Sequence, residues 1–117
     1  MPDLSKSKFT SLGSLIGTGT TTLYTVPNNH AAIVRHLSFS NNDTSNARTV
    51  TVQYANSNTS IVHTIVDGLD ISASGYNNIV DGSFITLNGG DRILVSAEAA
   101  GSINAFVSVE EYFDPAR

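Results

Sequence analysis

Among the side chains of this 117-residue chain that could bind a metal or take part in catalysis are three histidines. His30 follows a proline–asparagine turn, whereas His36 and His63 fall in two separate segments of strand character. A zinc site needs three or four converging ligands, usually including a closely spaced pair, and this spacing does not supply them. The chain also lacks cysteine, which excludes thiolate ligands, thiolate nucleophiles and disulfides. We therefore expect neither a metal site nor a cofactor.

The serine and carboxylate residues do not form a catalytic pattern either. Serines are plentiful, but the G-x-S-x-G turn that exposes a nucleophile does not occur. Glu110 and Glu111 are adjacent, and adjacent residues of a strand point to opposite faces, so we expect both to be solvated at a strand end. Asp67, Asp70 and Asp81 lie in glycine-containing turns, where aspartate usually caps its own backbone, and they lack calcium-loop spacing. The sequence predicts a protein that is not an enzyme.

The composition is poor in charge and rich in serine, threonine and asparagine. Only 14% of the residues are charged, the net charge is -4, and the six lysines and arginines are scattered, so a basic surface for nucleic acid is not expected. No apolar run has the length of a transmembrane helix. Near the N-terminus, polar residues and a glycine interrupt the apolar positions that a signal peptide would need. We expect a protein made in the cytoplasm, with no membrane and no nucleic acid as partner.

The chain is organised around the stretch from residue 23 to residue 41. Leu23–Val26 reads as a short strand, and the turn at residues 27–29 leads into a long strand over Ala31–Ser40. Proline fixes φ and asparagine tolerates turn conformations, which explains the turn. Arg35 interrupts the apolar positions of the long strand. We expect it either to reach solvent at a rim or to mark a β-bulge that shifts the register.

Further strands follow from alternation of apolar and polar residues. Arg48–Ala55 alternates most clearly, with Val50, Val52 and Tyr54 predicted to point inward, and the last long strand is predicted over Ile103–Tyr112. The remaining predicted strands are Ser11–Ile16, Ser60–Val66, Ser83–Leu87 and Asp91–Glu98. Residues 60–66 are apolar at both parities, which indicates cover on both faces or a place in an interface. About eight strands with turns every ~8–12 residues predict one antiparallel all-β domain, a sandwich or a small barrel.

The first residues differ from the rest. Residues 1–11 are polar and predict an extended N-terminal arm, and residues 12–117 form the β-domain. Both lysines of the chain, Lys6 and Lys8, lie in this arm. We expect Lys6, Lys8 and Phe9 to contact a partner, because an arm with two positive charges suits an acidic surface and can become ordered on binding.

Two stretches carry a resemblance to a known group of proteins. The segment L-Y-T-V-P-N-N-H-A-A-I-V-R-H-L-S-F-S-N-N, followed by R-T-V-T-V-Q-Y, resembles small virion proteins of tailed bacteriophages. The later segment I-T-L-N-G-G-D-R-I-L-V-S-A-E-A-A-G-S-I-N-A-F-V-S-V-E-E-Y is similar to them as well. The resemblance covers about residues 20–112, and its motifs mark a fold and carry no catalytic residue. The arm lies outside it.

The resemblance implies a jelly-roll β-sandwich that serves as an accessory protein of the virion. It favours a capsid decoration or cement protein, homotrimeric, that binds the major capsid protein and bridges its neighbouring subunits. One alternative is a β-sandwich module of a tail, neck or fibre, which would bind a receptor or a carbohydrate through Tyr24, Tyr76, Tyr112 and asparagine-rich loops. A small metal enzyme on a jelly roll is the third hypothesis, and it needs clustered histidine and carboxylate ligands.

Overall fold

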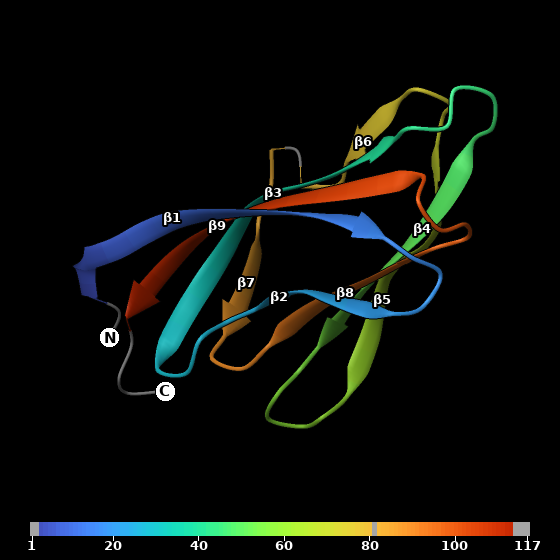
Figure 1. Cartoon of the computed structure of the whole chain (residues 1–117). Coiled ribbons are helices and arrows are strands. Elements are labelled where there is room, and N and C mark those ends of the chain that lie inside the picture. The colour runs from blue at the N-terminus through green and yellow to red at the C-terminus, as the bar shows by residue number, and fades with distance from the viewer. Residues whose placement is uncertain (1–2, 81, 114–117) are drawn as a thin grey trace.

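A computed structural model of the chain describes residues 3–80 and 82–113, with side chains from residue 8 onward (Figure 1). The described residues form nine strands and no helix. The strands are β1 (Asp3–Ile16), β2 (Thr21–Thr25), β3 (His30–Asn41), β4 (Arg48–Ala55), β5 (Val62–Ile71), β6 (Tyr76–Asn78), β7 (Ile85–Asn88), β8 (Arg92–Ala97) and β9 (Ile103–Phe113). The prediction of an all-β fold is confirmed.

The strands form two antiparallel sheets that pack as a sandwich. The first sheet has the order β1-β9-β3-β6, with β7 also paired to β3, and the second has the order β2-β8-β4-β5. Consecutive strands from β1 to β4 alternate between the sheets, and the last strand lies between the first and the third. This is the strand order of a jelly roll, in which β6 and β7 together occupy the place of one strand. Full pairing of β9 on both sides makes it the centre of the first sheet.

A β-bulge in β3 decides which side chains enter the core. The register of β3 against β9 shifts between Val34 and His36, so Arg35 occupies the bulge. Before the bulge Val34 is buried, and after it Leu37 and Phe39 are buried. The extra residue moves the inward parity by one, which is the known effect of a bulge. The prediction of a bulge at Arg35 is confirmed, and Ile33, which shares parity with Leu37, is only half-buried because of it.

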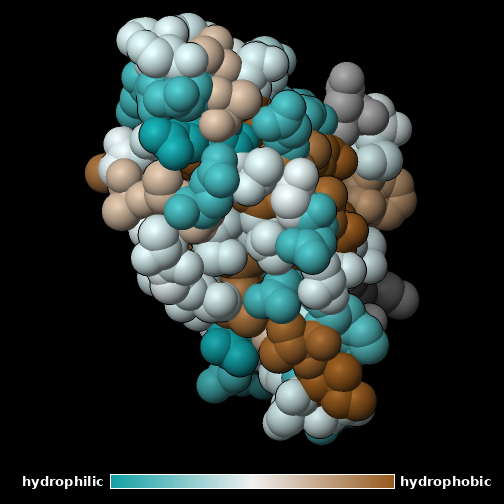
Figure 2. Space-filling model, turned by 90° about the vertical axis from the view of Figure 1, so that its right-hand side faces the viewer, coloured by the Kyte–Doolittle hydropathy of each residue, from teal (hydrophilic) through white to brown (hydrophobic). Residues whose placement is uncertain are grey.

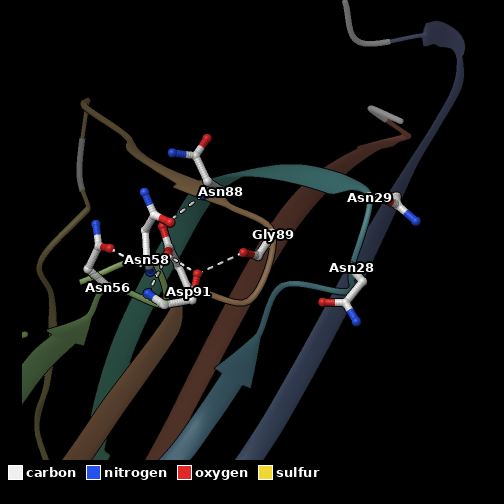
Figure 3. A pocket seen from close by; sticks show the side chains of 8 residues that line it. Asn28, Asn29, Asn56, Asn58, Asn88, Gly89 and Asp91 are labelled. Carbon is white, nitrogen blue, oxygen red and sulfur yellow. Dashed lines mark hydrogen bonds between the residues drawn. The ribbon is translucent and has the colours of Figure 1, made fainter. Parts of the chain in front are cut away.

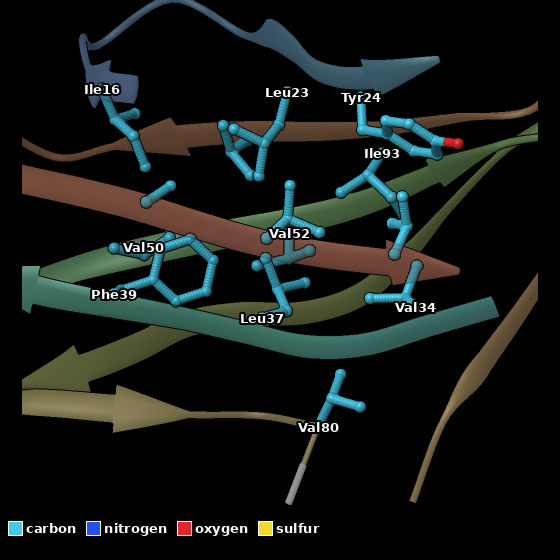
Figure 4. Packing of buried hydrophobic residues seen from close by; sticks show 14 of the residues in the cluster. Ile16, Leu23, Tyr24, Val34, Leu37, Phe39, Val50, Val52, Val80 and Ile93 are labelled. Atoms are coloured by element: carbon cyan, nitrogen blue, oxygen red, sulfur yellow. The ribbon is translucent and has the colours of Figure 1, made fainter. Parts of the chain in front are cut away.

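The core consists mainly of aliphatic side chains from both sheets, together with the rings of Phe39 and Tyr24 (Figure 4). From the first sheet, alternate residues of β9 point inward, as the sequence predicts: Ile103, Ala105, Val107 and Val109. From the second sheet, Val50, Val52 and Ile93 are buried to within 1% exposure, while Tyr54 is half-buried at the margin. Interdigitation of two apolar sheet faces is what holds a sandwich together.

Strands β1 and β5 differ from the sequence-based expectation. Strand β1 begins at Asp3. The expected arm therefore has an extended backbone from Asp3 on, and it continues directly into the strand that was expected at residues 11–16. The division of the chain at residue 11 stays a prediction. Strand β5 continues through Asp67-Gly-Leu-Asp70 to Ile71, where the sequence indicated an irregular segment. Gly68 has φ +72° and lies where the register against β4 shifts, so a glycine bulge carries the strand through a turn-like sequence.

Candidate interaction surface

Strand β1 lies at the edge of the first sheet. From Lys8 to Ile16 it pairs with Glu111 to Ile103 of β9 in one unbroken register. Within the described part of the chain, β9 is the only strand that pairs with β1, so the opposite edge of β1 has no strand beside it. Residues 8–15 are all exposed except the half-buried Thr10. An edge of this kind presents unpaired backbone N–H and C=O groups to a partner.

The outward face of β1 and β9 carries large apolar side chains. Directly opposed residues of an antiparallel pair lie on the same face, and the 2.9 Å contact between the Ser11 and Ser108 hydroxyls marks the outward one. Phe9, Leu15 and Phe106 share that face with 77%, 58% and 44% exposure. We call these three residues the outer patch. Its apolar surface is available to a binding partner.

The three residues predicted to contact a partner do not all face the same way. Phe9 lies in the outer patch, whereas Lys8 points to the opposite side of the sheet, where its Nζ is 3.6 Å from Oε1 of Glu111. The Lys8 side chain still has 68% exposure. The side chain of Lys6 lies outside the described residues. Leu15 and Phe106 were not predicted to contact a partner, although the two-residue alternation of outward positions in residues 8–16 and 103–113 identifies both.

Glu111 is buried and was wrongly predicted to be solvated. Its Oε2 accepts a 2.6 Å hydrogen bond from the hydroxyl of Tyr24, and each of the two residues is 4% exposed. Burial raises the pKa of Tyr24 far above its ordinary value, and the hydrogen bond to Glu111 raises it further. The prediction that Tyr24 contributes to an exposed sugar-binding groove is therefore wrong, because this side chain is part of the core.

The neighbouring carboxylate, Glu110, belongs to an ion pair on the outward face. Its Oε1 accepts hydrogen bonds of 3.2 and 3.0 Å from Nε and Nη2 of Arg35, the residue in the β3 bulge. A hydrogen bond from Tyr112, and after it those from Arg35, lower the pKa of Glu110. The hydrogen bond between Tyr112 and Glu110 also raises the pKa of Tyr112. The guanidinium of Arg35 also lies 5.9 Å from the centre of the Phe84 ring. The bulge thus places a cation where it links β9 to the loop before β7.

A second exposed apolar group lies at the start of β5. Ile61, Val62 and Ile65 are between 42% and 50% exposed. Figure 2 looks onto the side of the molecule where β4 and β5 lie, and hydrophobic side chains gather toward its lower end among hydrophilic ones. In the single chain the outward sides of these residues are not covered. Residues 60–66 are therefore not buried on both faces, and their place in an interface stays a prediction.

An asparagine-rich pocket of about 680 Å³ opens between the turns at one end of the sandwich (Figure 3). Its lining is formed by Asn28, Asn29, Asn56, Ser57, Asn58, Asn88, Gly89 and Asp91. The carboxylate of Asp91 is buried and accepts hydrogen bonds from the backbone N–H groups of Ser57 and Asn88 and from the hydroxyls of Ser57 and Tyr54, at 2.9 to 3.2 Å. Asp91 therefore holds the turns together. The outer amides give the pocket a neutral, hydrogen-bonding character.

The histidines are held separately by local contacts. His30 Nδ1 lies 2.9 Å from the carbonyl oxygen of Asn28, and His36 Nε2 lies 2.8 Å from the hydroxyl of Ser38. The ring of His63 stacks on that of Tyr54 with 6.3 Å between centroids. No group of three or more histidine and acidic residues with the geometry of a metal site occurs among residues 3–80 and 82–113. Asp81, one of the predicted turn aspartates, lies outside the described residues.

In the part of the chain that the structure covers, we find no helix with the length and apolar character to span a membrane. The sequence matches no protein-family model and no curated protein.

Solved structures share the fold at low sequence identity. A chain from the acid-stable capsid of Helicobacter pylori bacteriophage KHP30 superposes with a TM-score of 0.52 and 14% identity, over 93% of this chain and 88% of that chain. A chain from infectious bursal disease virus strain Gx gives a TM-score of 0.54 and 12% identity, over 97% of this chain but 33% of that chain. A chain from Bacillus endospore appendages, which are disulfide-linked pili, gives 0.53 and 11%, over 92% and 87%. The likeness shows a common β-fold, found here in structural proteins of two viruses and of a pilus.

Proposed function

We propose that this chain is a non-enzymatic structural protein of a virion, and more specifically a capsid decoration or cement protein that bridges subunits of the major capsid protein. The observation that carries the proposal is the likeness to a bacteriophage capsid chain, which spans nearly the whole of both chains. The phage-like motifs in residues 20–112 support the same assignment from the sequence.

The surface of the domain suits a protein that binds other β-structures. Strand β1 offers a free edge, and the outer patch beside it offers apolar area. The few charges are largely used internally, as in the Arg35–Glu110 and Arg48–Asp43 pairs at 3.0 and 2.8 Å. Binding through backbone hydrogen bonds and apolar contacts depends only weakly on salt. We therefore expect attachment to a capsid to persist at high ionic strength.

Mixing the purified protein with undecorated phage particles tests the proposal. We expect the protein to co-sediment with the particles and to raise the temperature at which they release their DNA. The variant Phe9→Ser should weaken co-sedimentation, while Tyr76→Ser, which changes an aromatic residue of similar exposure away from the outer patch, should not; the exposed fractions are 77% and 69%. Absence of binding by the unmodified protein would refute the decoration role.

A tail, neck or fibre location is the second candidate, and the asparagine-rich pocket favours it. Neutral amide groups around a pocket of about 680 Å³ suit a ligand with many hydroxyls, such as a glycan. Immunogold electron microscopy of the virion separates the two roles. Label over the capsid faces supports decoration, and label confined to the tail supports the alternative.

Homo-oligomerisation is part of the proposal. The resemblance favours a trimer, whereas the free edge of β1 favours a pairing of two copies, so the mass of the protein in solution distinguishes the two arrangements.

A further inference from the structure

We infer that strand β1 pairs with β1 of a second copy of this chain, antiparallel and centred on Leu12, so that the first sheet continues across a two-fold axis. The inference concerns the isolated protein. It does not depend on a virion location. Because the proposed capsid contact uses the same edge and Phe9, the pairing applies to the protein that is not attached to a particle.

Strand β1 is the edge best suited to such pairing. Its register with β9 is regular over nine residues, from Lys8 to Ile16. The other described edges are short or irregular: β2 has five residues and a register shift, β6 has three residues, β7 has four, and β5 contains two shifts. Bulges and short length protect an edge from pairing, and β1 between residues 8 and 16 has neither.

The sequence of β1 is complementary to itself in one register. With Leu12 opposite Leu12, the numbers of any two opposed residues add up to 24. Odd-numbered residues therefore face odd-numbered residues, and the outward faces of the two β1 strands lie on the same side of the sheet. The register then pairs Phe9 with Leu15, Thr10 with Ser14, and Ser11 with Gly13. Among the side chains of residues 8–16, Phe9 and Leu15 are the two most exposed apolar ones. Each would cover the other, and the symmetry makes the contact twice.

The same register avoids repulsion between charges. Residues 9–16 carry no charge, and Lys8 of one copy faces Ile16 of the other. The two Lys8 residues then lie about 26 Å apart, since eight residues of strand separate them. Gly13 has no side chain, so in this register it leaves room on the outward face for the Ser11 side chain of the other copy. These features make a second copy a suitable occupant of the β1 edge in the isolated protein.

A cysteine at residue 12 tests both the pairing and its register. Opposed residues of antiparallel strands have Cα atoms about 4.5–5.5 Å apart, within the range that a disulfide spans. The natural chain has no cysteine, so Leu12→Cys introduces the only thiol. We expect a disulfide-linked dimer in mild oxidant. Leu15→Cys is the control, because its two copies would lie about 20 Å apart, six residues along the strand. Failure of Leu12→Cys to cross-link, or equal cross-linking of Leu15→Cys, overturns the inference.

The mass in solution provides an independent readout. Light scattering on the unmodified protein should give twice the chain mass of 12.4 kDa, and Leu12→Lys, which sets two ammonium groups against each other on the axis, should weaken the dimer at least tenfold. Circular dichroism shows whether Leu12→Lys is folded. If it is not folded, the cross-linking of Leu12→Cys decides whether the two β1 strands pair. A monomer or a trimer as the only species of the unmodified protein, or a folded Leu12→Lys variant with undiminished dimer, contradicts the pairing.

Discussion

Replacing Tyr24 by phenylalanine removes one oxygen atom from the interior of the sandwich. That hydroxyl donates a 2.6 Å hydrogen bond to Glu111 Oε2, and both residues are 4% exposed. The aromatic ring, which packs in the core, is retained. The variant Tyr24→Phe therefore isolates the hydrogen bond from the packing.

The expected cost follows from the carboxylate that is left behind. A hydrogen bond to a charged group contributes about 1.5–3 kcal/mol, and an unsatisfied buried acceptor costs a similar amount. The contact from Lys8 to the other oxygen of Glu111 is long, at 3.6 Å, and its side chain is 68% exposed, so it compensates for little of the loss. We expect Tyr24→Phe to lower the free energy of unfolding by about 2 kcal/mol at neutral pH.

The same contact predicts a dependence on alkaline pH. The pKa of Tyr24 is raised above its ordinary value of 10.0, first by burial and then by Glu111. The folded state therefore keeps the proton that the unfolded state loses, and the stabilisation is complete below pH 10 and declines as the pH rises above it. The decline due to this residue is at most about 1.4 kcal/mol per pH unit. Tyr24→Phe should lack this part of the decline.

Urea denaturation followed by circular dichroism at pH 7 and at several values above pH 10 measures both effects. Tyr76→Phe is the matched control, because its side chain is 69% exposed, and we expect its stability to change by less than about 0.5 kcal/mol. A Tyr24→Phe variant as stable as the unmodified protein, with the same alkaline decline, would show that the buried hydrogen bond contributes nothing measurable.

Three further predictions concern the core, a turn and a surface carboxylate. Phe39→Ala should lower the free energy of unfolding by about 3–5 kcal/mol in urea denaturation, because a fully buried ring leaves a cavity between the sheets. Gly90→Ala should cost about 1–3 kcal/mol by the same measurement, since Gly90 has φ +86° and a Cβ there would lie 2.9 Å from the Cβ of Ser57. The backbone N–H of Ser45 and neighbouring donors lower the pKa of Asp43 below 3.8, so its stabilisation exists above that pH and is lost as the pH falls through the folded-state pKa. The melting temperature of Asp43→Asn should therefore be lower at neutral pH and fall less in acid than that of the unmodified protein.

The sequence predicts the central strands of the fold well because their side chains are buried on one face only. Alternation in β4 and β9 identifies Val50, Val52 and Val107 as core residues, and the structure buries all three. Arg35 marks its bulge because a charged residue at an apolar position needs a way out of the core.

The parts that the sequence does not predict depend on distant contacts. The polar N-terminal half of β1 has no apolar periodicity, and its pairing with β9 is recorded at Asp3 and again from Lys8 on, with a register shift between them. Glu111 looks like a solvated strand end, and only the fold places Tyr24, 87 residues away, over it. Gly68 suggests a turn, yet the pairing of β5 with β4 absorbs it as a bulge. Neither the β-propensity of a residue nor the alternation of apolar and polar residues indicates which distant residues will be in contact.

The pairing of β1 with β9 also sets the order in which the protein can fold. Ser11 and Ser108 lie 97 residues apart in the chain, so the first sheet cannot close before residues 103–113 have left the ribosome. Contacts between residues so far apart make folding slow, because the entropy of closing the loop is lost before the contact is gained. During that time the apolar half of β1 has no strand beside it. The nascent chain therefore passes through a stage in which this segment is open to chaperones and to other chains, and the yield of folded protein should fall as its concentration rises.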